Sequence, residues 1–497
     1  MTAKGDDSMT NIYTVSAFDS STFSTQTATG VSITNRFDFV NGGLDYLSRQ
    51  DWQGTWPATD GEVSDHLSTW SNEINGADGK PYTYRKTISA EDLAKVQSTD
   101  SLNPTDASSI TDTPVYNAKN GVSLIDLRGK DYDDPLWESL LDNLKPEDYH
   151  TIIALSGYGT AVLDSVGKPH AQDFDSATGL FMGGTGMTYC GVIVLAQTWN
   201  QELAERYGRM IGNEALTGSC TGWYAPAMNI HRLPYSGRNN EYYSEDSYLS
   251  GAMASASSRG AASKGMYTFI KHFAVSDQEN HRGDGSDSEG NVQQGLVTWA
   301  NEQALREIYL LPFEMCVTGD PITLSYVEDD GTGNYVNTTR EFPAVTAVMS
   351  SFNRLGYTWT GGCYPLLTNV LREEWGFNGF VITDAAHTRP FMDAYQMIEA
   401  GGNAKLTNAT SVPFTFEKND PAHYHYGREA LHGVLFAVAN SKAMSGLMPG
   451  SKFTTPLTIA ETILTVINIV CAVLILLLVW FIYRGFRKYK RAKSQQA

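Results

Sequence analysis

The chain of 497 residues contains few cysteines and few basic residues. Its five cysteines are Cys190, Cys220, Cys316, Cys363 and Cys471, and they form neither a CxxC pair nor a zinc-ligand spacing. A disulfide framework and a thiolate metal site are therefore not expected. We predict that the protein uses no metal ion and no other cofactor.

Lysine and arginine are outnumbered over most of the chain. Residues 1–483 contain 30 Lys and Arg against 55 Asp and Glu, a net charge of −25. A surface of this sign argues against nucleic acid as a partner and is typical of a solvated globular domain. Hydrophobic residues make up 41% of the sequence, which is enough for a full core at this length.

An export signal is missing from the beginning of the sequence. Residues 1–40 are polar and rich in Ser and Thr, without a basic start followed by an apolar stretch. The simplest interpretation is that this chain is the C-terminal part of a longer protein or of a split gene.

One uncharged apolar run, Thr462–Tyr483, is 22 residues long, which is enough to cross a bilayer as a helix. Six Lys or Arg residues follow it within residues 484–493. The positive-inside rule then predicts a single-pass protein of the cell membrane, with a cytoplasmic tail at residues 484–497 and the acidic domain outside. The alternative, a buried helix of a soluble protein, does not explain the basic residues.

The most informative stretch is Val348–Ala386. Its pattern predicts a strand at Ala344–Phe352, a helix at Cys363–Trp375 with apolar residues at one-turn spacing, and a second buried strand. That second strand delivers Asp384 at its C-terminal end, where a carboxylate must be paired, hydrated or used. Taken alone, the stretch leaves two interpretations open: Asp384 is a capping or turn residue, or it is a functional carboxylate.

This stretch resembles glycoside hydrolase family 3, the β-glucosidase family. The shared features are the turn Ser351-Phe352-Asn353, the run LLTNVLREEWGFNG that begins at Leu366, and the Thr383-Asp384 pair. The resemblance implies that Asp384 is the nucleophile that attacks the anomeric carbon. The family usually has Tyr where Phe352 stands, with its hydroxyl bonded to the nucleophile, and Phe cannot make that bond.

Three other segments resemble the family and imply substrate-binding residues. The run RLPYSGRNNEYYSEDSYL from residue 232 implies that Arg238 binds sugar, with Glu241 holding its guanidinium. The pair Lys271-His272 resembles the adjacent Lys-His pair of the family. Asp175 begins a weaker match to a turn whose Asp holds the hydroxyls of the terminal sugar, and it also has the simpler interpretation of a turn residue.

The resemblance implies a retaining, exo-acting glycoside hydrolase of carbohydrate catabolism. It would remove terminal β-D-glucosyl or related residues from a β-linked glucoside or oligosaccharide, through a covalent intermediate on Asp384. In the family a sandwich domain supplies the acid/base Glu, and no segment here matches it, so the implied partner is an upstream or separately encoded sandwich domain. The alternative is a catalytically weak or inactive, membrane-tethered sugar-binding barrel that lacks this domain.

The alternation of helices and strands from about residue 137 predicts an α/β fold with a parallel sheet. The resemblance specifies a (β/α) TIM-like barrel over residues 141–450, with Asp175, Arg238, Lys271, His272 and Asp384 at the C-terminal rim of its strands. Residues 1–45 are expected to be a remnant of an upstream β domain. Residues 46–140 are expected to be a linker that wraps over a neighbour.

Two local expectations can be checked against the backbone. Consecutive strand residues point to opposite faces, so Lys271 and His272 can both reach one sugar only if the backbone is irregular, and we expect a cis peptide or a strained dihedral there. The short apolar run Val192–Ala196 is predicted to be a strand.

Overall fold

The computed structural model describes residues 26–40 except 28, residues 459–495, and residues 89–451 except 181–185, 235, 280–281, 283–294, 388, 390 and 410–413. They belong to two compact units, Met1–Pro449 and Gly450–Ala497. Most of the expected N-terminal β remnant and the first half of the expected linker lie outside the described residues.

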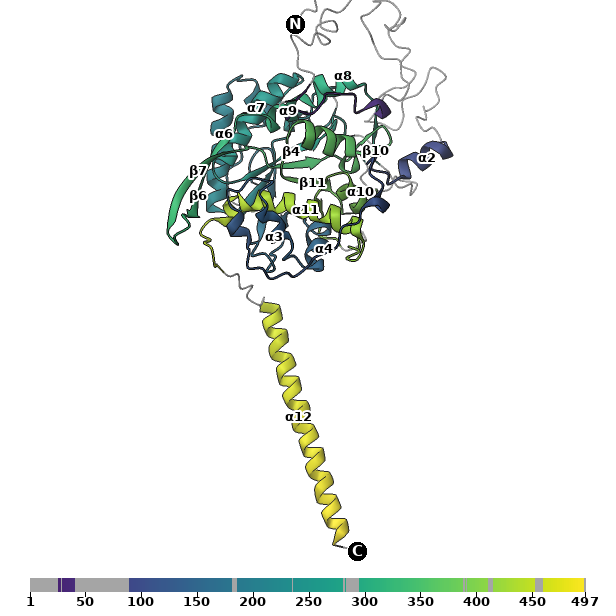
Figure 1. Ribbon diagram of the computed structural model, residues 1–497, viewed down its shortest axis with the longest axis vertical. Helices are drawn as coiled ribbons and strands as arrows, with labels where there is room; N and C mark the ends of the chain where they lie inside the picture. The colour runs from purple at the N-terminus through teal and green to yellow at the C-terminus, as the bar shows by residue number, and fades with distance from the viewer. Residues whose placement is uncertain are drawn as a thin grey trace, which may run out of the picture. The chain divides into compact units, whose positions relative to one another are not determined.

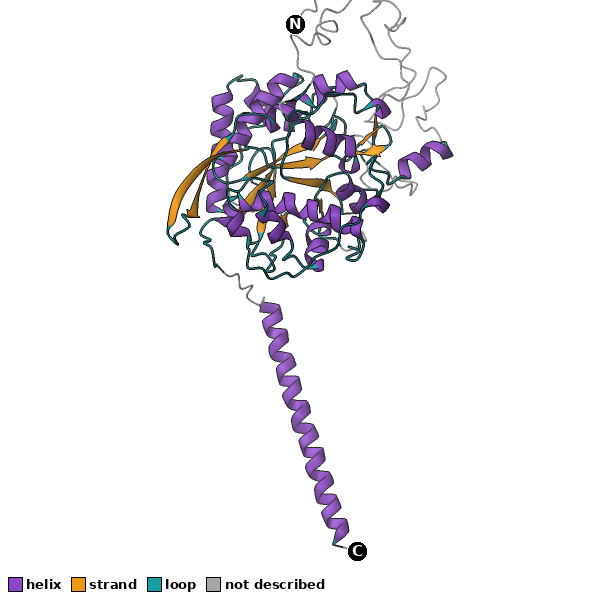
Figure 2. Ribbon diagram, viewed as in Figure 1, coloured by secondary structure: helices purple, strands orange, loops and turns teal. Residues whose placement is uncertain are grey.

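A curled sheet lies at the centre of the first unit, with helices around it (Figures 1 and 2). Its strand order is β1-β2-β3-β4-β8-β11-β12, in which β2 to β12 are parallel and β1 is antiparallel to β2. The strands are β1 (Gly159–Thr160), β2 (Ala171–Asp175), β3 (Cys220–Tyr224), β4 (Tyr267–Phe273), β8 (Ala347–Ser350), β11 (Phe380–Ala385) and β12 (Ala404–Leu406). This is the (β/α) barrel architecture that the sequence predicted.

Two backbone hydrogen bonds connect the ends of this sheet. Ser156 N–H donates to the Lys405 carbonyl at 3.2 Å, and Asp173 N–H donates to the Tyr158 carbonyl at 3.0 Å. Residues 156–158 therefore lie between β12 and β2, which brings the first and last strands of the barrel together.

The helices that cover the strands bury one apolar face each. They are α3 (Leu136–Leu141), α4 (Pro146–Ala154), α6 (Gln201–Thr217), α7 (Ser247–Ala262), α9 (Leu311–Val317), the π-helix η8 (Pro365–Glu374), α10 (Ala394–Glu399) and α11 (Pro421–Ala439). Leu366, Leu367, Val370 and Leu371 of η8 are fully buried, as the one-turn spacing predicted. Asn200 caps α6 by accepting from Leu203 N–H at 3.0 Å.

Helices α6 and α7 approach closely because glycines line their contact. A Cβ atom at Gly208 would lie 1.9 Å from the Ser257 carbonyl oxygen, and one at Gly260 would lie 2.1 Å from the Glu205 carbonyl oxygen. These two positions therefore admit no larger residue without a shift of one helix.

The run Val192–Ala196 was predicted to be a strand, and this prediction is wrong. The run forms the short helix α5. A run of five apolar residues has no periodicity that separates strand from helix, and here the run packs beside α6 and α7. The strands β6 (Ile322–Asp329) and β7 (Tyr335–Phe342) form an antiparallel hairpin.

The segment before the barrel contacts its outer surface. It contains the helix α2 (Ala90–Gln97), and its side chains bond to helices α10 and α11 and their connections. Ser101 Oγ donates to Glu399 at 2.7 Å, and Asn103 Nδ2 donates to the Tyr426 hydroxyl at 3.1 Å. The second unit consists of α12 (Ile459–Ser494), a helix whose described residues are all exposed.

Candidate active site

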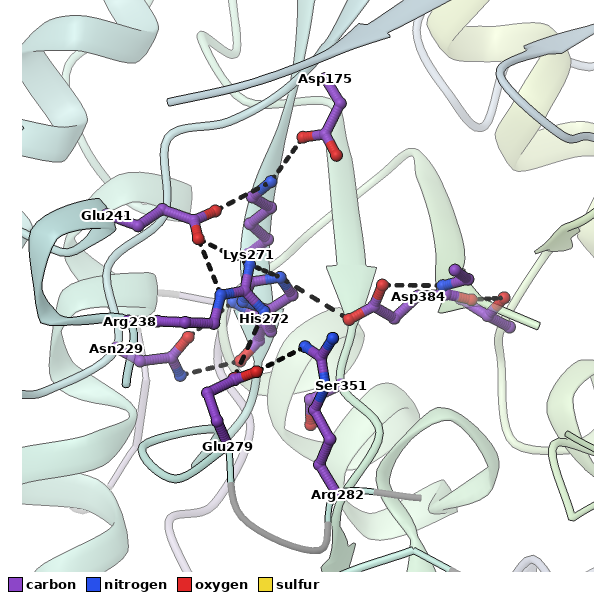
Figure 3. Close-up of polar contacts among 12 residues, drawn as sticks. Asp175, Asn229, Arg238, Glu241, Lys271, His272, Glu279, Arg282, Ser351 and Asp384 are labelled. Carbon is purple, nitrogen blue, oxygen red and sulfur yellow. Dashed lines mark hydrogen bonds and ion pairs between the residues drawn. The ribbon is translucent and has the colours of Figure 1, made fainter. Parts of the chain in front are cut away.

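Four of the five predicted site residues stand at the C-terminal ends of strands. Asp175 ends β2, Lys271 and His272 lie near the end of β4, and Asp384 lies near the end of β11. Because these strands are parallel, their ends meet at one rim of the barrel. Arg238 comes from the loop after β3, and Figure 3 shows the five side chains converging on one place. The structure thus brings together every site residue that the sequence predicted.

Two carboxylates and two cations alternate along one side of the site. Lys271 Nζ lies 2.7 Å from Asp175 Oδ1 and 3.2 Å from Glu241 Oε1. Glu241 Oε2 in turn lies 2.7 Å from the Arg238 guanidinium. Glu241 therefore holds both cations, one on each of its oxygens, and not Arg238 alone as the sequence indicated.

This pairing keeps the buried groups charged. Burial alone would lower the pKa of Lys271, but Asp175 and Glu241 raise it above its ordinary value. Burial would likewise raise the pKa of Glu241, but Lys271 and Arg238 lower it. A cation that stays protonated and fixed in direction is a donor suited to sugar hydroxyls.

The backbone at the end of β4 is irregular, as expected: the Lys271–His272 and Phe273–Ala274 peptide bonds are both cis. Asn229 holds this segment from one side, because its Oδ1 accepts from His272 N–H at 2.8 Å and its Nδ2 donates to the His272 carbonyl at 2.9 Å. Ser351 and Asn353 hold it from the other side by donating to the Ala274 carbonyl at 3.0 and 3.1 Å. The Ser-Phe-Asn turn thus fixes the Lys-His pair.

His272 is a neutral ring in this environment. Its pKa is lowered well below the usual value by burial and by Arg238, Lys271 and Arg282. Arg238 can only donate, so at 3.1 Å the Nε2 atom of His272 accepts from it. This assigns the ring proton to Nδ1, which lies 3.2 Å from the Tyr242 hydroxyl.

Asp384 is partly buried, with its side chain 13% exposed and one of its two oxygens hydrogen-bonded. Its Oδ1 accepts from Ala385 N–H at 2.7 Å. No hydrogen-bond donor among the described residues reaches its Oδ2, which lies 3.6 Å from His272 Nε2. Burial raises the pKa of Asp384, and Arg238, Ala385 N–H, Lys271 and Arg282 oppose that rise only in part.

Residues 150–325 match the model of the glycosyl hydrolase family 3 N terminal domain. Over these residues the chain is similar to the N-terminal domain of glycosyl hydrolase family 3. The match contains Asp175, Arg238, Lys271 and His272, whereas Asp384 follows beyond its end.

Curated proteins similar to this part of the chain include two bacterial β-glucosidases. The chain is 34% identical over 254 residues to a β-glucosidase of Rhizobium radiobacter, covering 50% of this chain and 27% of that protein. It is 35% identical over 254 residues to β-glucosidase A of Butyrivibrio fibrisolvens, covering 50% and 26%. The chain therefore spans about a quarter of the length of these curated relatives.

A solved structure shows the same fold. The β-glucosidase of Paenibacillus barengoltzii superposes with a TM-score of 0.51 at 22% identity, over 78% of this chain and 40% of that chain. At this identity the likeness concerns the fold alone.

Phe352 is buried, and two arginines lie against its ring. The guanidinium of Arg389 lies 4.1 Å from the centre of its ring, and that of Arg282 lies 4.8 Å from it. The Phe352 ring is therefore a surface for two stacked cations, and it carries no hydroxyl.

Several residues of the site were not assigned a role from the sequence. Arg282 pairs with Glu279 at 2.9 Å, and both lie beside Arg238 in Figure 3. Both follow the Lys271-His272 pair in the sequence, but their positions there do not say whether they reach the site. Asn229 and Tyr242 form hydrogen bonds with His272, which is distant from both in the sequence. The sequence signal for Asn229 is that it is a polar residue within an apolar segment.

Proposed function

We propose that this rim is the active site of a retaining glycoside hydrolase that acts on terminal β-D-glucosyl or related β-glycosyl residues. The observation that carries the proposal is the convergence of one partly buried carboxylate, Asp384, with a fixed set of charged donors and acceptors. A retaining glycosidase needs a carboxylate nucleophile that is held still and a set of groups that orient one sugar ring.

The nucleophile in this proposal is Asp384. Its Oδ2 has no donor among the described residues, so one oxygen carries a lone pair that is free to form a bond. Attack on the anomeric carbon would form the carbon–oxygen bond to Asp384 while the bond to the leaving oxygen breaks, and water would then hydrolyse the glycosyl-enzyme ester.

The remaining residues bind the sugar. Lys271 and Arg238, held by Glu241, would donate to hydroxyls of the terminal sugar, and Asp175, which is 45% exposed, would accept from them. Arg238 and Tyr242 would hold the neutral ring of His272 in place against the sugar. These assignments account for the charge alternation at the rim.

The acid/base residue comes from another domain in this proposal. Glu241 is engaged by two cations, and Glu279 is paired with Arg238 and Arg282, so neither is placed as a proton donor for a leaving group. The partner would be the upstream or separately encoded sandwich domain that the family resemblance implies. A substrate whose leaving group departs as an anion avoids the need for that residue.

This distinction defines the experiment. The chain alone should react slowly with a dinitrophenyl β-glucoside and scarcely with a disaccharide. A 2-fluoro glucosyl fluoride should leave a covalent adduct on the Asp384 peptide, detected by mass spectrometry. Asp384→Asn should abolish the adduct, whereas Asp393→Asn, at the cap of α10, should retain it.

One observation favours a second candidate, a sugar-binding barrel with little or no catalysis. The unpaired Oδ2 of Asp384 and the Phe at position 352 leave the nucleophile without the hydroxyl that the family usually supplies. Glucose binding in a calorimeter, together with no adduct on Asp384, would establish this candidate and contradict the enzymatic one.

We also propose that α12 anchors the protein in the cell membrane, with the barrel outside and residues 484–497 in the cytoplasm. The helix is long and apolar enough to span a bilayer. Protease added to intact cells should then degrade the barrel and leave the C-terminal tail protected. A protected barrel would reverse the orientation, and release of the protein by alkaline carbonate would contradict the anchor itself.

A further inference from the structure

The helix α12 continues well beyond its apolar part. The uncharged run of 22 residues ends at Tyr483, and the helix extends to Ser494. At 1.5 Å per residue the apolar part is about 33 Å long, close to the thickness of a bilayer's hydrocarbon core. The following residues therefore emerge at the headgroup level while still helical.

These emerging residues form a basic face. Arg484, Arg487, Lys488 and Arg491 recur at positions i, i+3, i+4 and i+7, which places them on one side of the helix. Lys490 and Lys493 add two more cations, and no acidic residue follows Glu461. We call these six residues the basic segment.

Aromatic side chains hold part of the basic segment close to the helix. Arg484 lies 5.0 Å from the ring centre of Trp480, and Arg487 lies 5.9 Å from that of Tyr483. Lys490 lies 5.2 Å from the ring centre of Phe486. Each cation thus turns back toward a ring one turn earlier, which keeps its charge near the end of the apolar run rather than extended into solvent.

We propose that the basic segment binds the anionic headgroups of phospholipids in the leaflet from which it emerges. The inference rests on the proposed anchor, because only insertion of α12 puts these cations at headgroup depth. The charge sign, the clustering beside a span and the aromatic flanks all fit an anionic lipid surface, which attracts juxtamembrane cations over about a Debye length. The barrel, with its acidic surface, has the opposite preference.

The experiment uses the full chain reconstituted into vesicles of phosphatidylcholine containing one fifth phosphatidylserine. The protein is then extracted with a polymer that keeps its surrounding lipids bound, and these lipids are identified by mass spectrometry. Phosphatidylserine should be severalfold more abundant among them than in the vesicle as a whole. High salt should reduce this enrichment. Replacing Arg484, Arg487, Lys488 and Arg491 together by Gln should remove most of it. The matched control, Arg484, Arg487 and Arg491 together replaced by Lys, should retain it.

The outcomes separate this inference from the anchor. A chain that incorporates into vesicles but gathers no phosphatidylserine, or whose Gln variant gathers as much as the native chain, overturns lipid binding and leaves the anchor standing. A chain that does not incorporate at all overturns both. Neither result bears on the chemistry proposed for Asp384.

Discussion

His272 Nε2 lies 3.6 Å from Asp384 Oδ2, yet the ring gives that oxygen no hydrogen. Nε2 already accepts from Arg238, and the cations around the ring keep it neutral. The imidazole therefore packs beside the carboxylate as a neutral ring and does not form an ion pair with it. As a result, Asp384 Oδ2 accepts no hydrogen bond from the described residues, and this is the oxygen that would attack in the proposed reaction.

Restoring the family hydroxyl should strengthen the nucleophile. Phe352→Tyr should increase the rate of Asp384 labelling by the 2-fluoro sugar by about tenfold to a hundredfold, the value of one hydrogen bond to a charged group. The control Phe416→Tyr adds the same hydroxyl to a ring that stacks on Tyr149, and it should change nothing. An unchanged rate in Phe352→Tyr would mean that the missing hydroxyl does not limit the reaction.

The labelling rate should depend on the ionisation of Asp384. Only the carboxylate attacks, and burial raises its pKa, so labelling should decline with falling pH sooner than an ordinary aspartate would predict. Arg282→Gln removes one of the groups that lower this pKa, so the acid limb should move to higher pH. Arg206→Gln, in an exposed pair on α6, is the control and should leave the profile in place.

The same raised pKa has a consequence for stability. A carboxyl whose pKa is higher in the folded than in the unfolded state favours folding when protonated, and this contribution is lost as pH rises through the folded pKa. Asp384→Asn mimics the protonated form. Its free energy of unfolding should therefore exceed that of the native chain increasingly as pH rises from acid toward neutrality, measured by urea titration. A constant difference across pH would show that Asp384 does not titrate differently on folding.

Removing the charge of Glu241 should weaken sugar binding through Lys271 and Arg238. Glu241→Gln keeps the shape of the side chain but leaves two cations without their shared carboxylate. Glucose affinity, measured by calorimetry, should fall by about tenfold or more. Glu205→Gln removes a carboxylate that also pairs with two arginines, Arg209 and Arg259, and should not affect binding. Equal losses in both variants would indicate general destabilisation.

The contact between α6 and α7 should not tolerate a methyl group. Gly208→Ala places a Cβ atom against the Ser257 carbonyl oxygen and should destabilise the barrel by about 1–3 kcal/mol, as overpacking does. Met210→Ala, on the exposed face of the same helix, should change the free energy of unfolding by less than about 0.5 kcal/mol. Similar values for the two variants would show that the helices move apart easily.

The sequence by itself determined the elements whose signals are local. The helix Pro365–Glu374, the strand Phe380–Ala385 and the cap at Asn200 follow from apolar spacing and one side-chain hydrogen bond, which neighbouring residues fix without the rest of the fold. The site residues were predicted from the family resemblance, whose motifs consist of residues that are close together in the sequence. The strand prediction for Val192–Ala196 was wrong because five consecutive apolar residues show no periodicity. The segment forms a helix where it packs beside α6 and α7.

The tertiary structure decided how those residues act on one another. Three interactions join segments that are separated by up to 43 residues in the sequence. Two cations share Glu241, Asn229 bonds to the main chain of His272, and Arg389 stacks on Phe352. The protonation of His272 and the raised pKa of Asp384 depend on burial and on charges contributed by other strands and loops. These are properties of distance and solvent exclusion, which a linear order of residues does not contain.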